Sequence, residues 1–408
     1  MNKATQRYIK VFPWFQGLTG DLLFYIAIDT LFLSLVKNFT AAEIVSLTSF
    51  SQLACIALQF PVLFVIKRIG NTASVRCGSL FLLLSAVLIT FGRSYALVLV
   101  GRIFHDVAAI FKSASIVALE NNLDLMDKRE DFVRVRTQAN TVYAVITMLI
   151  SFVASYMFNM NNYLPMICCI GTCTVGFILS LLMKDTSGYN RISRKKKAAG
   201  VKINYNKVTI ISLVLFALFY SIVTNGQNEG KLFIQQNVLD SFDKDATALI
   251  IGAIVCVSRI IRVISNIIFV KLYKKYGEKM GIALPVLLFT SIGLLLVGSF
   301  IPSVVLMILV MGVGYIIILF IRDPFKLYVQ DVLFAATPKE QHQTLLTVME
   351  FGVKVATAVI GLAFSAILLE SPMVVIIAIM LAIALVGIAL AVWLYRAIMI
   401  GKRNAQGV

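Results

Sequence analysis

Two aspartates interrupt an otherwise apolar stretch near the start of the chain, GDLLFYIAIDTLFLSLV at residues 20–36. A charged side chain at the centre of a membrane helix costs about 2.5–3.5 kcal/mol, so Asp21 and Asp29 should face a protein interior or a water-filled cavity. A carboxylate in such a place can bind and release a proton. Proton exchange is therefore the chemistry that these two residues are suited to perform.

A second apolar segment with internal charges is LVLVGRIFHDVAA at residues 97–109, where Arg102 and Asp106 lie four residues apart on one helix face. At about 1.5 Å per residue, Asp29 lies about 10 Å and Arg102 about 9 Å below the same membrane surface. Asp21 and Asp106 lie deeper, at similar levels. Two interpretations remain open: Asp21 or Asp29 carries a proton and has Arg102 as its exchangeable partner, or Asp29 and Arg102 form a fixed salt bridge between two helices.

A third polar stretch, TNGQNEGK at residues 224–231, places Asn225, Gln227, Asn228 and Glu229 between two glycines. Glycines permit a break in a membrane helix, and a broken helix exposes hydrogen-bonding groups to a cavity. We expect these side chains to contact hydroxyl, carboxylate or amide groups of a solute. The alternative is an ordinary polar end of a helix.

Further basic residues lie inside later apolar segments. Arg259 and Arg262 are one helical turn apart, so at most one needs to face a cavity, and the other can pair or reach the membrane surface. Together with Arg102, and with Lys231 if it faces inward, Arg259 would make a cavity cationic. A cationic cavity favours an anionic or zwitterionic solute.

Several other charged residues are expected to have structural roles. Arg322, Asp323 and Lys326 fall near the end of an apolar segment and are interpreted as gate or loop contacts. Glu350 and Lys354 have helical pair spacing and are expected to bind each other.

Histidine and cysteine form no recognisable catalytic or metal-binding pattern. The two histidines are far apart in the sequence, and we expect His105 to take part in helix packing. The six cysteines fall in apolar segments and lack metal-ligand spacing with a histidine. The sequence therefore predicts no catalytic residues, no metal and no cofactor.

The elements that must position these residues are membrane helices. Of the 408 residues, 59% are hydrophobic and 14% charged, with a mean hydropathy of +0.90. Apolar runs near 20 residues recur, and each is long enough to cross the hydrocarbon layer as a helix. We predict twelve spans, at residues 12–36, 42–66, 76–92, 96–120, 137–158, 163–183, 208–233, 246–271, 280–300, 303–326, 344–369 and 372–396.

Basic residues concentrate in alternate loops, at residues 3–10, 67–68, 128–136, 191–202, 271–279 and 402–403. By the positive-inside rule, both termini are predicted to be cytoplasmic. The net charge of +17 is thus explained by topology and contact with anionic lipid, and no nucleic-acid partner is expected. The short loops favour a multi-pass protein of a bacterial cytoplasmic membrane.

The two halves of the chain resemble each other. LFYIAID near residue 23 matches LFYSIVT near residue 218, and FVIKRIGN near residue 64 resembles FVKLYKKYGE near residue 269. This order predicts a duplicated six-helix unit. The domains are therefore predicted to be an N-terminal six-helix bundle at residues 1–184, a basic cytoplasmic linker at 185–207 and a C-terminal six-helix bundle at 208–408.

Charges are absent from the interiors of the third, sixth, ninth and twelfth spans, so these four should face lipid and the others should surround a polar space. The absence of charge from every third span, together with the division into six plus six spans, resembles the pattern of the major facilitator superfamily. The resemblance implies an all-α membrane protein with twelve transmembrane helices, in two pseudo-symmetric six-helix bundles around a central cavity.

The family's short motifs are only partly present. Arg102 matches the arginine of its fourth-helix motif, but Asp106 replaces the expected glycine. In its loop motif between the second and third helices, Arg68 and Gly70 match, but Lys67 replaces an aspartate. The fifth-helix Gly-Pro motif of drug–proton antiporters is missing.

The sequence thus predicts a secondary active transporter that moves a small polar or charged solute by alternating access, coupled to protons or another ion. It lacks the phosphate-binding loop of ATP-driven transporters. The alternative is a multidrug–proton antiporter that exports amphiphiles. Remote alternatives are a non-transporting membrane scaffold and an intramembrane enzyme. The expected partners are the solute, the coupling ion and membrane lipids. We expect the protein to be a monomer.

Overall fold

The computed structural model describes residues 3–128, 131–185, 206–338 and 342–406, and within these ranges the regular structure is entirely helical. The chain divides into two compact units. Unit 1 contains residues 1–39 and 50–197, and unit 2 contains residues 40–49 and 198–408. Most of the predicted linker, residues 186–205, lies outside the described residues.

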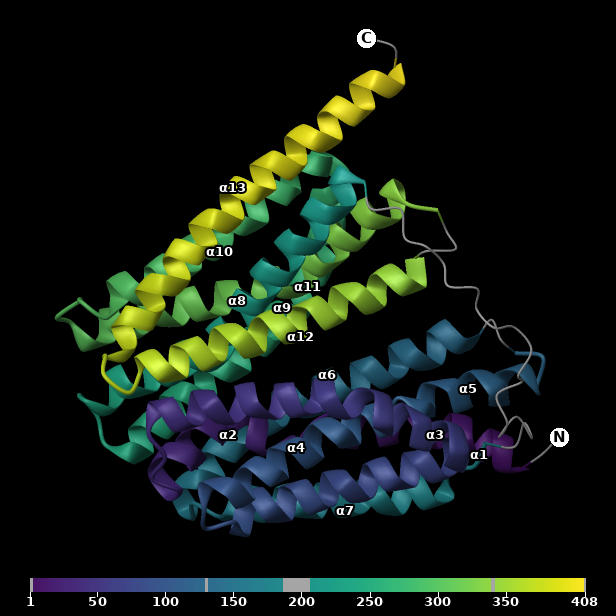
Figure 1. Ribbon diagram of the computed structural model, residues 1–408. Coiled ribbons are helices and arrows are strands. Elements are labelled where there is room, and N and C mark those ends of the chain that lie inside the picture. The colour runs from purple at the N-terminus through teal and green to yellow at the C-terminus, as the bar shows by residue number, and fades with distance from the viewer. Residues whose placement is uncertain (1–2, 129–130, 186–205, 339–341, 407–408) are drawn as a thin grey trace. The chain divides into compact units, whose positions relative to one another are not determined.

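Unit 1 is built from seven helices and one short π-helical turn, drawn in purple to blue-green in Figure 1. They are α1 (Lys3–Thr19), α2 (Tyr25–Leu31) with the π-turn Phe32–Val36, α3 (Ala41–Phe91), α4 (Tyr95–Lys112), α5 (Ala114–Asp124), α6 (Asp131–Met160) and α7 (Leu164–Leu182). The first residues of α3, up to residue 49, are counted with unit 2. The first predicted span is broken, because residues 20–24 between α1 and α2 are not helical. The fourth span is divided into α4 and α5 at Ser113.

The long helix α3 contains the second and third predicted spans. Gly70 within it has φ 80° and ψ 170°, which is not helical and divides α3 into two helices. This backbone conformation is essentially restricted to glycine, because a Cβ atom would clash with the chain. The glycine of the KRIG sequence is therefore required by the turn between two spans.

Replacing Gly70 with alanine is expected to destabilise the protein by about 1–3 kcal/mol, because alanine rarely adopts this conformation. The thermal unfolding midpoint of the purified variant measures the loss. Gly171→Ala in α7 is the matched control, since a Cβ there meets nothing within 4 Å and the residue has no positive φ. Equal midpoints for the two variants would contradict the requirement for glycine at position 70.

An aspartate from the end of α7 holds the turn at Gly70. Asn71 and Asn121 donate hydrogen bonds to Oδ2 of Asp185, at 2.8 and 3.1 Å. The backbone N–H of Asp185 donates to Oγ1 of Thr72 at 2.9 Å. Lys67 stands where the loop motif has an aspartate, and the carboxylate that anchors this turn comes from Asp185 instead.

A lysine binds the carbonyl groups at the C-terminal end of α3. Nζ of Lys37 donates to the carbonyl oxygens of Thr90 and Gly92, at 2.7 and 2.8 Å, and lies 5.2 Å from the ring centroid of Phe32. A cation at a helix C-terminus interacts favourably with the helix dipole. Burial lowers the pKa of Lys37 below its ordinary value.

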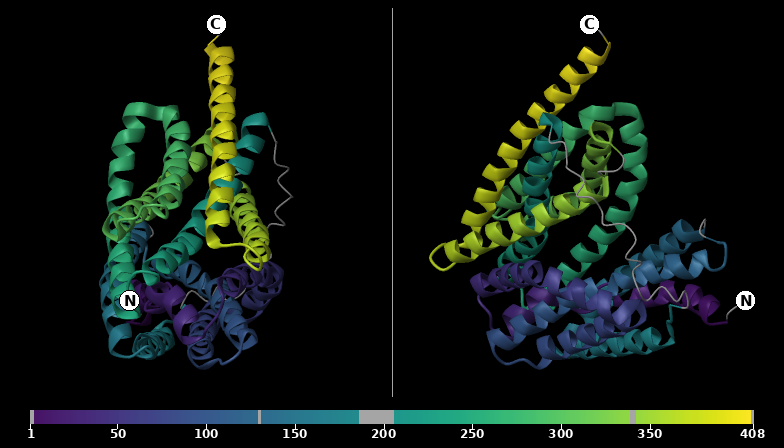
Figure 2. Two further views of the ribbon diagram at one scale, coloured as in Figure 1. Left: turned by 90° about the vertical axis from the view of Figure 1, so that its left-hand side faces the viewer. Right: turned by 45° about the vertical axis from the view of Figure 1, so that its right-hand side comes forward.

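Unit 2 contains six long helices and one 3₁₀ turn. They are α8 (Lys207–Leu239), α9 (Lys244–Tyr276), the turn Gly277–Lys279, α10 (Met280–Gly298), α11 (Val304–Ala336), α12 (His342–Ile367) and α13 (Met373–Gln406). Side chains of Asn206 and Asp243 cap α8 and α9 by accepting backbone N–H bonds at 2.8 Å. Figure 2 shows that the end of α13 extends beyond the helices against which it packs.

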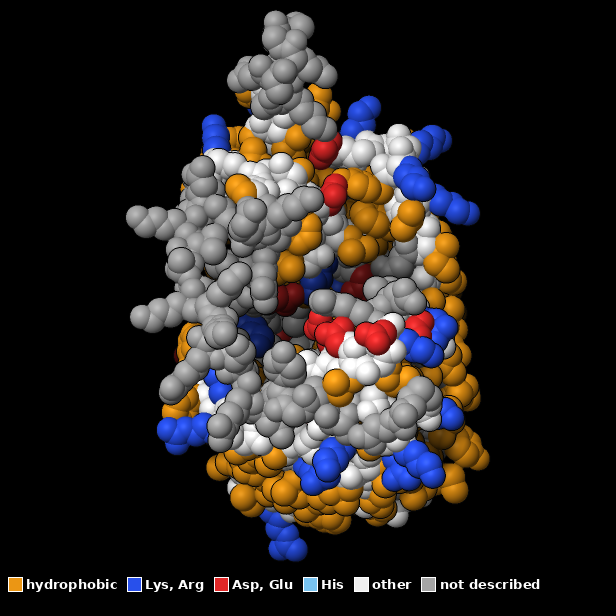
Figure 3. Space-filling view, turned by 90° about the vertical axis from the view of Figure 1, so that its right-hand side faces the viewer, with side chains coloured by type: hydrophobic (Ala, Val, Ile, Leu, Met, Phe, Trp, Pro, Cys, Tyr) orange, Lys and Arg blue, Asp and Glu red, His pale blue; other side chains and the backbone are white. Residues whose placement is uncertain are grey.

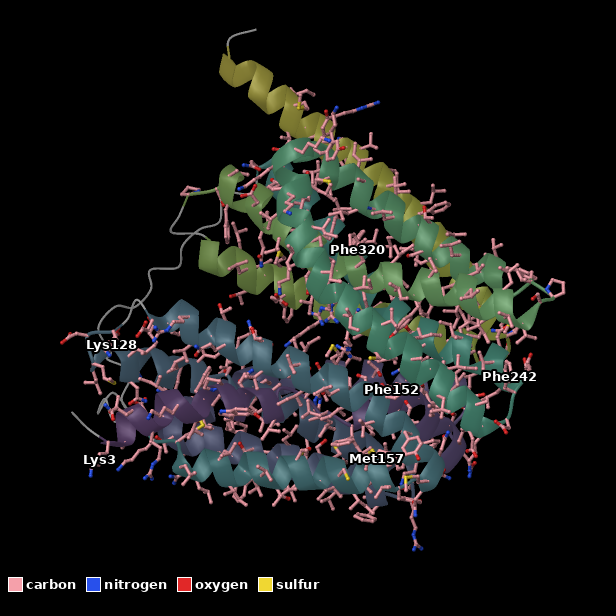
Figure 4. All side chains as sticks on the ribbon, turned by 180° about the vertical axis from the view of Figure 1, so that it is seen from behind. Lys3, Lys128, Phe152, Met157, Phe242 and Phe320 are labelled. Carbon is pink, nitrogen blue, oxygen red and sulfur yellow. The ribbon has the colours of Figure 1, made fainter. Side chains whose placement is uncertain are left out.

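The helices are those of an integral membrane protein. Among the described residues, nine helices are long and apolar enough to cross a membrane, with α3 counted once. Large apolar side chains remain exposed on the outside, including Phe60 (75%), Phe300 (72%) and Leu369 (77%). Figure 3 shows hydrophobic side chains over broad areas of the visible surface, together with scattered Lys and Arg side chains. Lys3 and Lys128, from two predicted cytoplasmic segments, lie at the same end of unit 1, and Met157 lies at the other end (Figure 4).

Candidate functional site

The break in the first span places Asp21 among backbone groups that have lost their helical partners. Nζ of Lys112, at the end of α4, donates to the carbonyl oxygen of Thr19, the last residue of α1. The N–H of Leu22 donates to Oδ1 of Asp21 at 2.8 Å. A Cβ at Gly20 would lie 2.6 Å from the ring of Tyr143 in α6, so only glycine fits there. Side chains of neighbouring helices therefore stabilise this break.

A histidine joins two of the predicted aspartates. Nε2 of His105 lies 2.9 Å from Oδ1 of Asp21, and Nδ1 lies 3.3 Å from Oδ1 of Asp106. The three side chains are partly exposed, at 29% for Asp21, 18% for His105 and 23% for Asp106. We expected His105 to serve helix packing; the structure places it at the centre of the polar cluster in unit 1.

Arg102 lies beside this cluster. Its guanidinium carbon is 5.7 Å from the ring centroid of Tyr25, and it interacts electrostatically with Asp21, Asp29 and Asp106. Oδ1 of Asp29 accepts the backbone N–H of Thr30 at 2.7 Å. The four candidate residues of unit 1 thus share one electrostatic environment, while a direct salt bridge between Asp29 and Arg102 stays a prediction.

The expected break at TNGQNEGK does not occur, because α8 is continuous from Lys207 to Leu239. Its glycines serve close packing instead. A Cβ at Gly226 would lie 3.2 Å from both Ile318 and Met380, and a Cβ at Gly230 would lie 3.2 Å from Leu295. The small residues therefore let α10, α11 and α13 approach α8.

The polar residues of α8 point to different sides of the helix. Asn225 and Glu229 are buried, at 2% and 3% exposed, whereas Gln227 and Asn228 are partly exposed. Nδ2 of Asn225 and Oε2 of Glu229 have no hydrogen-bond partner among the described residues. Since residues two apart lie on nearly opposite helix faces, Gln227 faces away from Asn225 and Glu229.

The partly exposed side of α8 binds an arginine that we had interpreted as a gate or loop contact. Nη1 of Arg322, in α11, donates to Oε1 of Gln227 at 2.8 Å. Its Nε donates to the hydroxyl of Tyr220 at 3.1 Å, and the guanidinium carbon lies 5.7 Å from the Tyr220 ring centroid. Arg322 therefore belongs to the candidate site of unit 2. The available signal in the sequence was a charged residue inside the predicted span 303–326.

The neighbouring charges form ion pairs between helices. Arg262 binds Asp323 through two hydrogen bonds, from Nε to Oδ2 at 2.7 Å and from Nη2 to Oδ1 at 2.9 Å. Lys326 binds Glu350, which corrects the expected pair of Glu350 with Lys354: the partner on another helix lies within direct contact. Nε of Arg259 is buried without a hydrogen-bond partner in the described part of the chain.

Within the described ranges, no group of three or more His, Cys, Asp or Glu side chains could hold a metal ion. The arrangement instead offers a carboxylate–imidazole–carboxylate cluster in unit 1 and arginines held by helix contacts in unit 2. These groups can exchange a proton and bind a charged solute.

The sequence pattern of the Major Facilitator Superfamily matches residues 16–325. The chain therefore belongs to this superfamily, and it is a membrane transporter rather than an enzyme. No curated protein sequence matches the chain.

Solved transporter structures share the fold over nearly the whole length. The nucleoside transporter NupG has a TM-score of 0.73 at 12% identity, with 98% of each chain covered. A bacterial homologue of the iron transporter ferroportin, in an inward-facing state, has a TM-score of 0.72 at 11% identity, covering 97% of this chain and 100% of that chain. A bacterial homologue of the human lysosomal transporter Spinster gives 0.69 at 11% identity, covering 97% and 98%. These similarities support the twelve-helix fold.

Proposed function

We propose that the protein is a proton-coupled secondary transporter that moves a small polar or charged solute by alternating access. The observation that carries the proposal is the position of His105 between Asp21 and Asp106, at 2.9 and 3.3 Å. Buried and partly buried ionisable groups within a membrane protein are functional candidates by default. The cluster gives such groups a specific chemical role.

The hydrogen bonds of the cluster depend on one exchangeable proton. An ionised carboxylate only accepts hydrogen bonds, and a neutral imidazole has only one N–H. With both carboxylates ionised, His105 must be doubly protonated to donate to Asp21 and Asp106 together. Loss of one proton removes one of the two bonds. The cluster is therefore suited to store a proton and to change its contacts when the proton leaves.

The proton is coupled to the backbone through Asp21. This residue lies in the non-helical segment between α1 and α2 and also accepts the N–H of Leu22. Releasing Asp21 from His105 frees a carboxylate at a point where the helix is already interrupted. The resulting shift of α2 against α4 is the step that we assign to the transport cycle.

The test is transport in proteoliposomes, with a panel of carboxylates, amino acids, nucleosides and hydrophobic cations. Asp21→Asn is expected to abolish proton movement driven by the solute while solute exchange continues, because a neutral amide no longer stabilises the doubly protonated His105. Asp29→Asn, the other aspartate of the first span, is the matched control and should retain coupling. Transport by Asp21→Asn that keeps the full pH dependence of the wild type would contradict the proposal.

The same panel of solutes also distinguishes the proposed function from the alternative one. Competition by hydrophobic cations would indicate a multidrug–proton antiporter, whereas competition by carboxylates, amino acids or nucleosides would indicate a transporter of polar metabolites. We further propose cytoplasmic termini in a bacterial cytoplasmic membrane. The alternating basic loops support this orientation, as does the common position of Lys3 and Lys128 in unit 1 (Figure 4).

A further inference from the structure

Three cations from α9 and α11 occupy one region of unit 2, and among the described residues two of them have an acidic partner and the third has none. Arg262 is neutralised by Asp323, and Lys326 by Glu350. The partners of Arg322 are neutral: the hydroxyl of Tyr220 and the amide oxygen of Gln227. In the described residues no carboxylate pairs with Arg322. Its positive charge is therefore held in place but not compensated.

The two neutral partners leave part of the guanidinium open. Arginine has five N–H donors in a planar fork. Tyr220 and Gln227 take the N–H of Nε and one N–H of Nη1, at 3.1 and 2.8 Å. The remaining N–H groups have no acceptor among the residues that the structure places. Such a pre-oriented fork matches the geometry of a carboxylate or phosphate group, which it can bind through two parallel hydrogen bonds.

Arg322 also lies on the accessible side of α8. Partly exposed residues recur along this helix at helical spacing, at positions 213, 217, 220, 224 and 227. This stripe includes both side chains that hold Arg322. The opposite side, with Asn225 and Glu229, is buried. A solute that reaches this stripe therefore meets the open donors of Arg322.

The other unpaired groups near Arg322 are also donors. Nε2 of Gln227 is buried and has no hydrogen-bond partner in the part of the chain that the structure describes, while Oε1 of the same amide accepts from Arg322. Two contacts between α9 and α11 show which of their residues lie at the same level. Gly312 faces Ile254, and farther along both helices Asp323 binds Arg262. Arg259 lies on α9 between these two contacts, about one turn from the level of Arg322. It adds a second cation, and its Nε has no hydrogen-bond partner among the described residues.

We propose that Arg322 is the anion-binding centre of the solute site and that the transported solute carries a carboxylate or another oxyanion. This inference rests on the proposed transport function and names its substrate class. In this arrangement, Tyr220 and Gln227 are positioning residues: they fix the guanidinium without removing its charge. Gln227 keeps its place as a substrate-cavity candidate, acting through Arg322.

The experiment measures binding to the purified full-length protein by thermal shift at constant ionic strength. The probes are acetate, lactate, succinate and inorganic phosphate, with choline and uridine as cationic and neutral comparisons. A ligand that binds the native state raises the unfolding midpoint. We expect at least one oxyanion to stabilise the wild type. A larger rise of the unfolding midpoint with succinate or lactate than with phosphate would indicate a carboxylate solute, and the reverse would indicate a phosphorylated one.

The affinity for that oxyanion should fall at least about tenfold in Arg322→Gln and less in Arg322→Lys, which keeps the charge but loses the fork. Lys326→Gln, which removes a cation from the same helix, is the matched control and should bind as the wild type does. Equal binding by Arg322→Gln and the wild type, or stabilisation by uridine or choline alone, would overturn the inference. Transport of a neutral or cationic solute at the same rate by Arg322→Gln and by the wild type would also overturn the inference. That result would leave the proposed transport function intact.

Discussion

Replacing Arg262 with methionine is expected to destabilise the protein by about 3 kcal/mol, because it leaves the Asp323 carboxylate uncompensated within the helix bundle. The two side chains are 28% and 24% exposed and share two hydrogen bonds, at 2.7 and 2.9 Å. Two parallel bonds between a guanidinium and a carboxylate form one of the stronger ionic contacts in proteins. The pair joins α9 to α11, so its loss should loosen the contact between these helices.

A double-mutant cycle measures the contact itself. Arg262→Met and Asp323→Leu should each lower the thermal unfolding midpoint by several degrees, whereas the double variant should recover most of the loss, since no isolated charge remains. Arg259→Met is the control, because Arg259 lies one turn away on α9 and forms no ion pair in the described structure. Strictly additive losses in the double variant would show that the pair contributes nothing beyond its separate side chains.

The second large effect is expected at His105. In His105→Phe, Asp21 and Asp106 both lose the donor that they share at 2.9 and 3.3 Å. A hydrogen bond to a charged group contributes about 1.5–3 kcal/mol, and a change of about 1.4 kcal/mol alters an equilibrium tenfold. Solute-driven proton movement should therefore fall at least about tenfold. Proton uptake into proteoliposomes, followed with a pH-sensitive dye, provides the measurement.

His105→Gln separates the role of the proton from the role of the contact. The glutamine amide can donate a hydrogen bond to one carboxylate but has no exchangeable proton at physiological pH. This variant should fold with a midpoint near that of the wild type and still fail to couple solute to protons. Normal coupling in His105→Gln would rule out His105 as the proton carrier and leave the aspartates alone in that role.

The sequence alone predicted the membrane-helix class of the fold. Each crossing of the hydrocarbon needs about 20 apolar residues, and this requirement is local, so apolar runs in the sequence identify the spans. The division of α3 at Gly70 falls between the second and third predicted spans, and α8 begins at Lys207, one residue before the seventh predicted span. The sequence also showed which residues are costly in a membrane, and Asp21, Asp106 and Gln227 all appear in the polar clusters.

The tertiary structure decided where the helix break falls. The glycines of TNGQNEGK permit a break, but there they allow α10, α11 and α13 to pack closely on α8. The break occurs instead at residues 20–24, where Lys112 and His105 bind the exposed groups. Those two residues are far from the break in the sequence. A pattern of neighbouring residues cannot show which distant helix compensates an interrupted one.

The tertiary structure also decided which charges pair. Glu350 has a lysine four residues away, yet it binds Lys326 of another helix. Arg322 and Asp323 are adjacent in the sequence but end up in different environments, one beside Tyr220 and Gln227 and the other bound to Arg262. Hydrophobicity along the chain determines that a helix enters the membrane. The partner of a charge depends on which helix faces meet, and that is set only when the helices pack.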